Sequence, residues 1–314
     1  MLRYKWPLAL DLIKRGYEAG RQKKLLALFT EYFEESGPTV ELTILGGTGY
    51  ATKDPENAEA LLSTNFDSTL LKRGSVPAVL HMCDVTTPGV ALEFHLGSRN
   101  LAMKALLGEG IFTQDGSPWK HSRELLRRQF VRVQYQDLEG FRDHVERMIE
   151  ALGQSPGVID LQPYFFRLTL DITIATILGR PVENFRHEIA DQFSRSFDEA
   201  SRITATRGRL GDLYWLYTPK GFVGACKAVK TYIAEFIKDS IQQDCDTVET
   251  SDRYRFITDL YSEYQNTRLV RDQVINVILA GRDTTAATMS YVLWVNPASI
   301  ANVWTDGTST AAFW

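Results

Sequence analysis

The hydrophobic pattern of the chain is strongest between Asp272 and Trp294, where it predicts a buried helix. Apolar residues first fall at helical spacing and then extend nearly all round the helix: Val274, Ile275, Val277, Ile278 and Leu279. A helix that is apolar on every side is buried on every side. We therefore expect this segment to lie in the interior of the protein.

The middle of this helix is polar, which a plain core helix does not require. It reads Gly-Arg-Asp-Thr-Thr at 281–285, and a glycine inside a helix costs about 1 kcal/mol relative to alanine. Ala280 and Thr284 share one face, so a small residue and a hydroxyl leave space there for a flat, reactive group. Asp283 can exchange protons with Thr284 through water, and Thr284 can donate to the Ala280 carbonyl. An equal alternative is an ordinary buried helix in which these polar residues form hydrogen bonds with their neighbours.

A second informative pattern lies between Leu106 and Phe130. Ser117 followed by Pro118 is typical of a helix start and predicts a cap at Ser117. Trp119 and Arg123 are then one turn apart and point the same way. An indole N–H and a guanidinium on one face can hold a carboxylate. A basic surface helix with a buried tryptophan is the alternative.

The N-terminal part predicts one helix followed by a small β-hairpin. Residues 16–35 are amphipathic, and residues 39–45 alternate like a strand. A glycine-rich turn at 46–49 then leads to a returning strand at 50–53. Asp54 before Pro55 marks the start of the next helix.

The rest of the chain is predicted to be helical. Further helices are expected at 137–152, 163–178, 183–203, 222–242 and 253–264. No repeat and no boundary interrupts this pattern, so we predict a mainly α fold in which residues 1–294 form a single domain.

Composition excludes several classes of protein. A net charge of -4 argues against a nucleic-acid binder. Three cysteines, Cys83, Cys226 and Cys245, show neither metal-ligand spacing nor a disulfide framework. No apolar run is long enough to predict a membrane span. The sequence also holds no G-x-S-x-G, H-E-x-x-H or P-loop motif.

Both informative patterns resemble motifs of the heme-thiolate monooxygenases, the cytochrome P450 family. The run Ala280–Thr285 resembles the oxygen-activating motif of that family's long central helix. The resemblance implies that Ala280 and Gly281 lie against the heme, and that Asp283 and Thr284 relay protons to dioxygen. Trp119 and Arg123 resemble the family's W-x-x-x-R helix, which implies that they hold the heme propionates.

The resemblance covers most of Lys5–Trp294, and within the family the sequence is most similar to fungal hydroxylases of n-alkanes and fatty acids. It implies a heme cofactor, a small apolar aliphatic substrate, and electrons from NADPH through a separate NADPH–cytochrome P450 reductase. By family the protein would act at the surface of the endoplasmic reticulum membrane. Because the chain lacks the family's N-terminal anchor, a cytoplasmic location is the alternative.

The chain departs from the family at three places. The family's cysteine loop for heme iron, F-x-x-G-x-x-x-C-x-G, does not follow Trp294, so no metal ligand is predicted. Residues 72–96 show no period and are interpreted as a foreign insertion, and residues 295–314 as a tail outside the family. We therefore expect a truncated cytochrome P450 fold, about the first two thirds, that is inactive as it stands. A non-catalytic fragment or pseudogene product, or a helical protein that binds apolar ligands, is the alternative.

Overall fold

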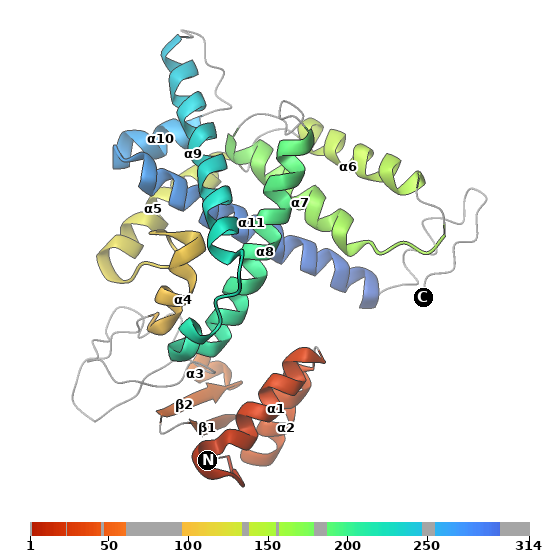
Figure 1. The fold of residues 1–314 in the computed structure, drawn as a ribbon, viewed down its shortest axis with the longest axis vertical. Helices are drawn as coiled ribbons and strands as arrows, with labels where there is room; N and C mark the ends of the chain where they lie inside the picture. The colour runs from red at the N-terminus through yellow and green to blue at the C-terminus, as the bar shows by residue number, and fades with distance from the viewer. Residues whose placement is uncertain are drawn as a thin grey trace. The chain divides into compact units, whose positions relative to one another are not determined.

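The structure is a computed structural model that describes residues 2–22, 24–44, 47–60, 96–133, 138–154, 157–178, 187–246 and 255–295. Within these ranges the chain is mainly α-helical and carries one two-stranded sheet, which confirms the predicted fold class (Figure 1). The predicted insertion lies outside the described residues except for Leu96. The predicted tail lies outside them except for Val295.

The elements follow one another along the chain as a hairpin set among helices. The N-terminal elements are η1 (Pro7–Ala9), α1 (Leu10–Arg21), α2 (Leu25–Ser36), β1 (Thr39–Ile44), β2 (Gly47–Thr52) and α3 (Pro55–Glu59). Next come α4 (Ser98–Leu107), α5 (Gly116–Val133), α6 (Leu138–Gly153), α7 (Gln162–Leu178) and α8 (His187–Leu210). The last are η4 (Gly211–Leu216), α9 (Phe222–Asp246), α10 (Arg255–Tyr264) and α11 (Thr267–Val295).

The prediction of one helix over 16–35 is wrong, because the chain forms two helices there. α1 ends at Arg21, and α2 begins at Leu25 after Lys24, whose backbone is not helical. The apolar side chains that predicted the helix belong to α2, whereas the break falls in a polar run with no apolar face to bury. Asp54 caps α3 as predicted, since its carboxylate accepts the backbone N–H of Glu56 at 3.0 Å.

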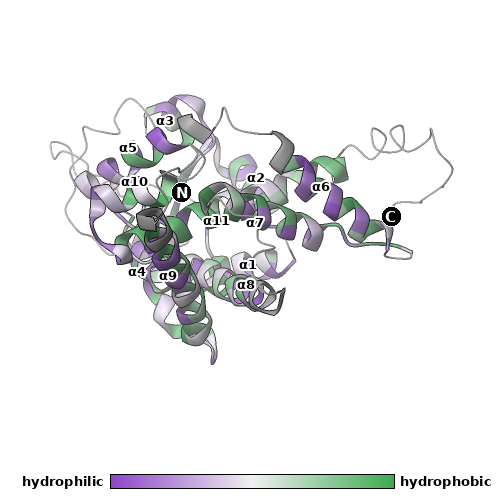
Figure 2. Ribbon diagram, turned by 90° about the horizontal axis from the view of Figure 1, so that it is seen from above, coloured by the Kyte–Doolittle hydropathy of each residue, from purple (hydrophilic) through white to green (hydrophobic). Residues whose placement is uncertain are grey.

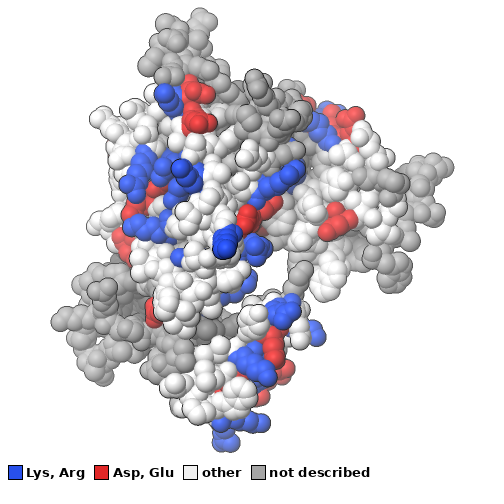
Figure 3. Space-filling view, in the orientation of Figure 1, with Lys and Arg blue, Asp and Glu red and all other residues white. Residues whose placement is uncertain are grey.

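The contacts between residues divide the chain into two compact units. One unit comprises Met1–Ala105, Thr113–Gly116 and Arg202–Lys220, and the other comprises Leu106–Phe112, Ser117–Ser201 and Gly221–Trp314. The prediction of a single domain over 1–294 stays a prediction. On the face drawn in Figure 3, Lys and Arg side chains are interspersed with Asp and Glu.

The first unit has a core between the hairpin and the two N-terminal helices. β1 and β2 pair antiparallel from Thr39–Thr52 to Ile44–Gly47, so β2 begins three residues before the predicted Tyr50. Every second residue of β1 points inward, as the period of a strand requires. The resulting core contains Leu2, Leu12, Tyr32, Val40, Leu42 and Ile44.

The second unit is built around α11, which packs against α7, α9 and α10. Every side chain from Asp272 to Ile278 is buried, which confirms the predicted interior helix for these residues. From Leu279 to Trp294 only Arg282 and Ala286 are buried, so the prediction is wrong for this part of the helix. In Figure 2, α6 carries hydrophilic segments beside hydrophobic ones. The end of α11 is exposed, with Tyr291 62% and Trp294 77% accessible. In the described part of the chain, no helix has the length and apolarity needed to cross a membrane.

We expect a valine-to-alanine substitution to change the free energy of unfolding differently in the two halves of α11. Val274→Ala removes two buried methyl groups and leaves a cavity, so we expect a loss of about 2 kcal/mol in the free energy of unfolding. Val292→Ala, at a position that is 54% exposed, is expected to change it by less than about 0.5 kcal/mol. Denaturant unfolding of both variants measures the difference, and equal losses would contradict this assignment of the core.

Candidate functional site

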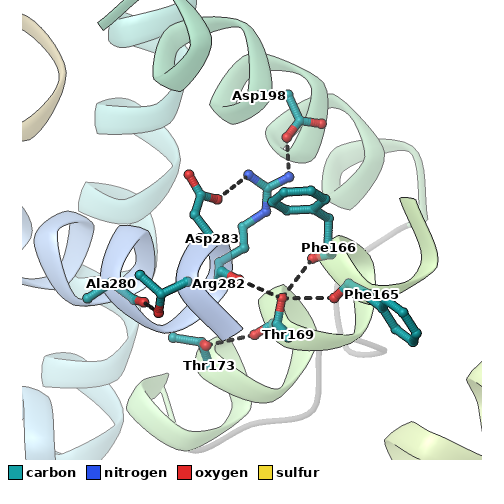
Figure 4. Close-up of polar contacts among 9 residues, drawn as sticks. Phe165, Phe166, Thr169, Thr173, Asp198, Ala280, Arg282 and Asp283 are labelled. Atoms are coloured by element: carbon teal, nitrogen blue, oxygen red, sulfur yellow. Dashed lines mark hydrogen bonds and ion pairs between the residues drawn. The ribbon is translucent and has the colours of Figure 1, made fainter. Parts of the chain in front are cut away.

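The polar turn of α11 is organised around Arg282, whose side chain is only 3% exposed. Its guanidinium donates from Nη1 to Oδ1 of Asp283 at 3.0 Å and from Nη2 to Oδ1 of Asp198 on α8 (Figure 4). A buried guanidinium is costly without a partner, and here the Asp283 and Asp198 carboxylates, which reach solvent, provide its partners. Asp283 therefore sits in an ion pair, which explains how a carboxylate is kept in this helix.

Two aromatic rings enclose the same guanidinium. Its Cζ lies 4.9 Å from the centre of the Phe166 ring on α7 and 5.3 Å from that of Phe197 on α8. The hydroxyl of Thr169 on α7 donates to the backbone carbonyl of Arg282 at 3.0 Å. Contacts of a cation with ring faces are attractive and become stronger when water is excluded. α7 and α8 thus fix both the backbone and the side chain of Arg282.

Thr284 and Ala280 interact as the sequence predicts. The Thr284 hydroxyl donates to the Ala280 carbonyl at 2.7 Å, within one turn of α11. Thr284 is exposed, while Ala280 and Asp283 are partly exposed. Asp283 and Thr284 therefore bond to different neighbours, although both reach solvent. Water between them is the route by which the predicted proton exchange would run.

Gly281 is required by the packing of α7 against α11. A Cβ at this position would lie 2.7 Å from Oγ1 of Thr173 on α7, closer than side-chain carbons come to such atoms. That direction faces a helix, so the glycine has a packing role the sequence did not indicate. Its placement against a heme remains a prediction.

The electrostatic environment of Asp283 has opposing parts. Burial raises the pKa of its carboxyl, the Arg282 guanidinium opposes the rise, and the Asp198 carboxylate adds to it. The outcome is a pKa above the ordinary value for aspartate. Such a carboxyl takes up a proton more readily than one in water.

Trp119 and Arg123 lie together on α5, as their spacing predicts. The Arg123 guanidinium carbon is 5.4 Å from the centre of the Trp119 ring. Trp119 is partly buried and Arg123 is exposed, so the pair borders on solvent. The cap predicted at Ser117 is wrong, because α5 already begins at Gly116. A helix start displaced by one residue is the usual uncertainty at helix ends.

Three polar residues in the buried half of α11, Asp272, Gln273 and Asn276, hold the segment before α5. We call them the α11 clamp. Asp272 accepts the backbone N–H of Glu109 at 2.9 Å, and Gln273 accepts that of Ile111 at 3.2 Å. Asn276 accepts the N–H of Phe112 at 3.0 Å and donates to the carbonyl of Leu107 at 3.0 Å. The α11 clamp was not predicted from the sequence, although three polar side chains in an apolar helix must find partners.

Gln273 also ties α5 itself to α11. Its Nε2 donates to the hydroxyl of Ser122 at 2.7 Å and to that of Tyr264 on α10 at 3.2 Å. The two hydroxyls are 2.9 Å apart. Ser122 directly precedes Arg123, so this buried network sets the position from which Arg123 and Trp119 project.

Gly108 shows how closely the α11 clamp approaches the backbone. It has φ +63°, and a Cβ there would overlap the Asp272 carboxylate. Glycine is the residue that satisfies both requirements. The Gly-Glu-Gly run at 108–110 and the polar positions of α11 therefore require each other.

No cluster of side chains suited to a metal ion is found among the described residues. Of the three cysteines, Cys226 is the one whose side chain the structure describes, and it is buried in α9. Its neighbours in sequence do not match the family's heme-ligand loop. It therefore provides no candidate for a thiolate ligand.

Comparison with solved structures identifies the class to which this arrangement belongs. A cyanobacterial CYP120A1 with bound retinoic acid has a similar fold, with a TM-score of 0.57 and 14% sequence identity. The similarity covers 85% of this chain and 54% of that one. The described helices therefore adopt the fold of a cytochrome P450.

The sequence comparisons show the family. The model described as Cytochrome P450 matches residues 93–295, and the chain belongs to this family. A cytochrome P450 of Arthroderma benhamiae is 34% identical over 92% of this chain and 51% of its own length. Cytochrome P450 52E2 of Candida apicola is 31% identical over 93% of this chain and 54% of its own length. The chain thus spans about half the length of these relatives, less than the two thirds expected.

The α11 clamp can be tested by removing one side chain. Asn276→Ala leaves the Phe112 N–H and the Leu107 carbonyl without their partner, so we expect a loss of about 2–4 kcal/mol in the free energy of unfolding. Thr288→Ala, an exposed position on the same helix, should change it by less than about 0.5 kcal/mol. Denaturant unfolding measures both variants. A small effect at Asn276 would mean that water replaces its bonds.

Proposed function

We propose that this chain is part of a heme-dependent monooxygenase that hydroxylates a small aliphatic substrate, such as an alkane or a fatty acid. The observation that carries the proposal is the α11 turn, where Asp283 and Thr284 follow Ala280 and Gly281 inside the region matched by the family model. When bound, heme supplies the centre at which dioxygen is activated. The chain's own residues bind it, exclude water and move protons.

The residues of α5 fit the acidic edge of a heme. Arg123 is exposed and lies beside the ring of the partly exposed Trp119, so both side chains border on solvent. Charge-assisted bonds from arginine to carboxylate are among the stronger hydrogen bonds in proteins. We propose that Arg123 and Trp119 hold the propionates, in the position that the Gln273–Ser122 bond fixes.

The residues of α11 fit a role in proton movement. Ala280 is small and partly exposed, so it leaves room for a flat group beside the helix. Thr284 can exchange its bond to the Ala280 carbonyl for one to water. Asp283 takes up a proton readily and reaches solvent. We propose that Asp283 receives protons from solvent and that Thr284 passes them on through water.

Partners and location follow from the family. We propose that electrons come from NADPH through a separate cytochrome P450 reductase, and that the enzyme works at the surface of the endoplasmic reticulum membrane. The substrate class rests on the resemblance of Gly108–Phe130, Gly211–Leu216 and Ala280–Ala286 to fungal alkane and fatty-acid hydroxylases.

Arg123→Ala tests the propionate site. Loss of a charge-assisted bond costs about 1.5–3 kcal/mol, so we expect hemin to bind at least about tenfold more weakly. Arg128→Ala removes an equal charge from another face of α5 and should leave the affinity unchanged. Absorption titration of each purified variant with hemin gives the affinities. Equal weakening in both would indicate a general charge effect instead of a propionate site.

Thr284→Ala tests the proton path in a full-length enzyme that contains this chain together with the family's heme-ligand loop, loaded with heme and supplied with reductase. Without the hydroxyl, protons are delivered incorrectly, so more hydrogen peroxide should form per NADPH consumed while hemin affinity stays the same. Thr285→Ala, the neighbouring exposed threonine, is the matched control. Peroxide and NADPH are measured in the same assay, and unchanged coupling at Thr284 would place the relay elsewhere.

A further inference from the structure

Asp198 on α8 contacts the same guanidinium that holds Asp283. The two carboxylates bind different nitrogens of Arg282, Asp198 at Nη2 and Asp283 at Nη1 (Figure 4). Their exposure differs strongly, with 57% of the Asp198 side chain accessible, 36% of Asp283 and 3% of Arg282. One buried cation is thus shared between an outer carboxylate and the carboxylate of the candidate site.

The guanidinium cannot move freely toward either carboxylate. Phe166 and Phe197 lie within 5.3 Å of its Cζ, and Thr169 fixes the backbone of the same residue. Arginine presents its donors in a rigid planar fork, so a bond at one end of the fork constrains the other end. The position of Asp198 therefore affects the geometry that Arg282 offers to Asp283.

We propose that Asp198 is a positioning residue for Asp283, acting through the Arg282 guanidinium that both carboxylates share. When Asp198 on α8 is bound, its carboxylate compensates part of the guanidinium charge, and Asp283 is held by Nη1 of Arg282. Without that bond, the charge of Arg282 acts on Asp283 alone. The proposal rests on the proposed function only where it gives Asp283 a role in proton relay.

The charges around Asp283 make the direction of this effect unambiguous. Among the described residues, Arg282 on its own helix and Asp198 on α8 are the charged groups that act on it. α7 meets the same turn with uncharged side chains, Phe166 and Thr169. The Asp198 carboxylate repels the Asp283 carboxylate directly and also competes for its cation. Both effects favour protonated Asp283, so removing the Asp198 charge favours ionised Asp283.

The coupling links the protonation of Asp283 to the position of α8. Asp198 lies beside Phe197, whose ring packs on the same guanidinium. A shift of α8 that separates Asp198 from Arg282 would lower the pKa of Asp283, and its return would raise it again. The pKa of Asp283 would then depend on the position of α8.

The test measures the pKa of Asp283 in the chain itself, without heme. The carboxyl carbon of Asp283 is followed by NMR in protein with ¹³C-labelled aspartate, and its signal is assigned by its disappearance in Asp283→Asn. Titration from about pH 3 to about pH 8 spans the range in which aspartates ionise in proteins. Asp198→Asn is compared with Glu199→Gln, which removes the same charge from the next position on α8.

We expect Asp198→Asn to move the Asp283 titration to lower pH and Glu199→Gln to leave it in place. Asp198→Glu, which keeps the charge, should restore most of the native value. Equal shifts in the Asn and Gln variants, or none in Asp198→Asn, would overturn the proposal. Because Asp198 is largely exposed, its variants are expected to fold, and circular dichroism checks this. The result does not depend on heme binding or turnover, so it is separable from the outcome of the function tests.

Discussion

The structure of the second unit depends on the need of buried polar groups on α11 for hydrogen-bond partners. A helix buried on every side offers no water to Asp272, Gln273, Asn276 or Arg282, and an unsatisfied buried group costs about 1–3 kcal/mol or more. Each of them is bonded to a neighbouring part of the chain. The first three bind the segment before α5, and Arg282 binds α8. The elements that carry the candidate site are thus located by the polar exceptions in an apolar helix.

The same constraint explains why the site residues lie on separate helices and still have fixed positions. Gln273 uses its oxygen for the Ile111 N–H and its nitrogen for Ser122, so one side chain locates both the approach to α5 and α5 itself. Arg123 then needs no buried partner of its own and can remain at the surface. The buried hydrogen-bond network thus fixes the position of an exposed side chain. Functional sites whose geometry is held to within about 0.5 Å are generally supported in this way.

Contacts between residues close together in the sequence could be predicted, whereas contacts between residues far apart in the sequence could not. Pairs within one turn were predictable, as with Thr284 and Ala280 or Trp119 and Arg123, because helical spacing alone brings them together. The burial of residues 272–278 was also predictable from their apolar pattern, whereas the exposure of the rest of α11 was not. The partners of its polar residues were not, since Asn276 bonds to a residue 164 positions away and Arg282 to one 84 positions away. Sequence spacing does not predict which residues form such pairs. It indicates only that a polar residue in an apolar helix needs a hydrogen-bond partner.

The candidate turn lies where α11 changes from a buried helix to an exposed one. From Asp272 to Ile278 its side chains are enclosed, whereas beyond Thr284 many of them reach solvent. A carboxyl that must be both held in one geometry and supplied with protons needs both environments within one turn. Arg282 and the rings around it provide the fixed side, and the exposed Thr284 provides contact with water. A relay placed further toward Asp272 would lie among buried side chains, and one placed toward Trp294 would lie away from Arg282. The position of Asp283 therefore follows from the burial profile of the helix as much as from its motif.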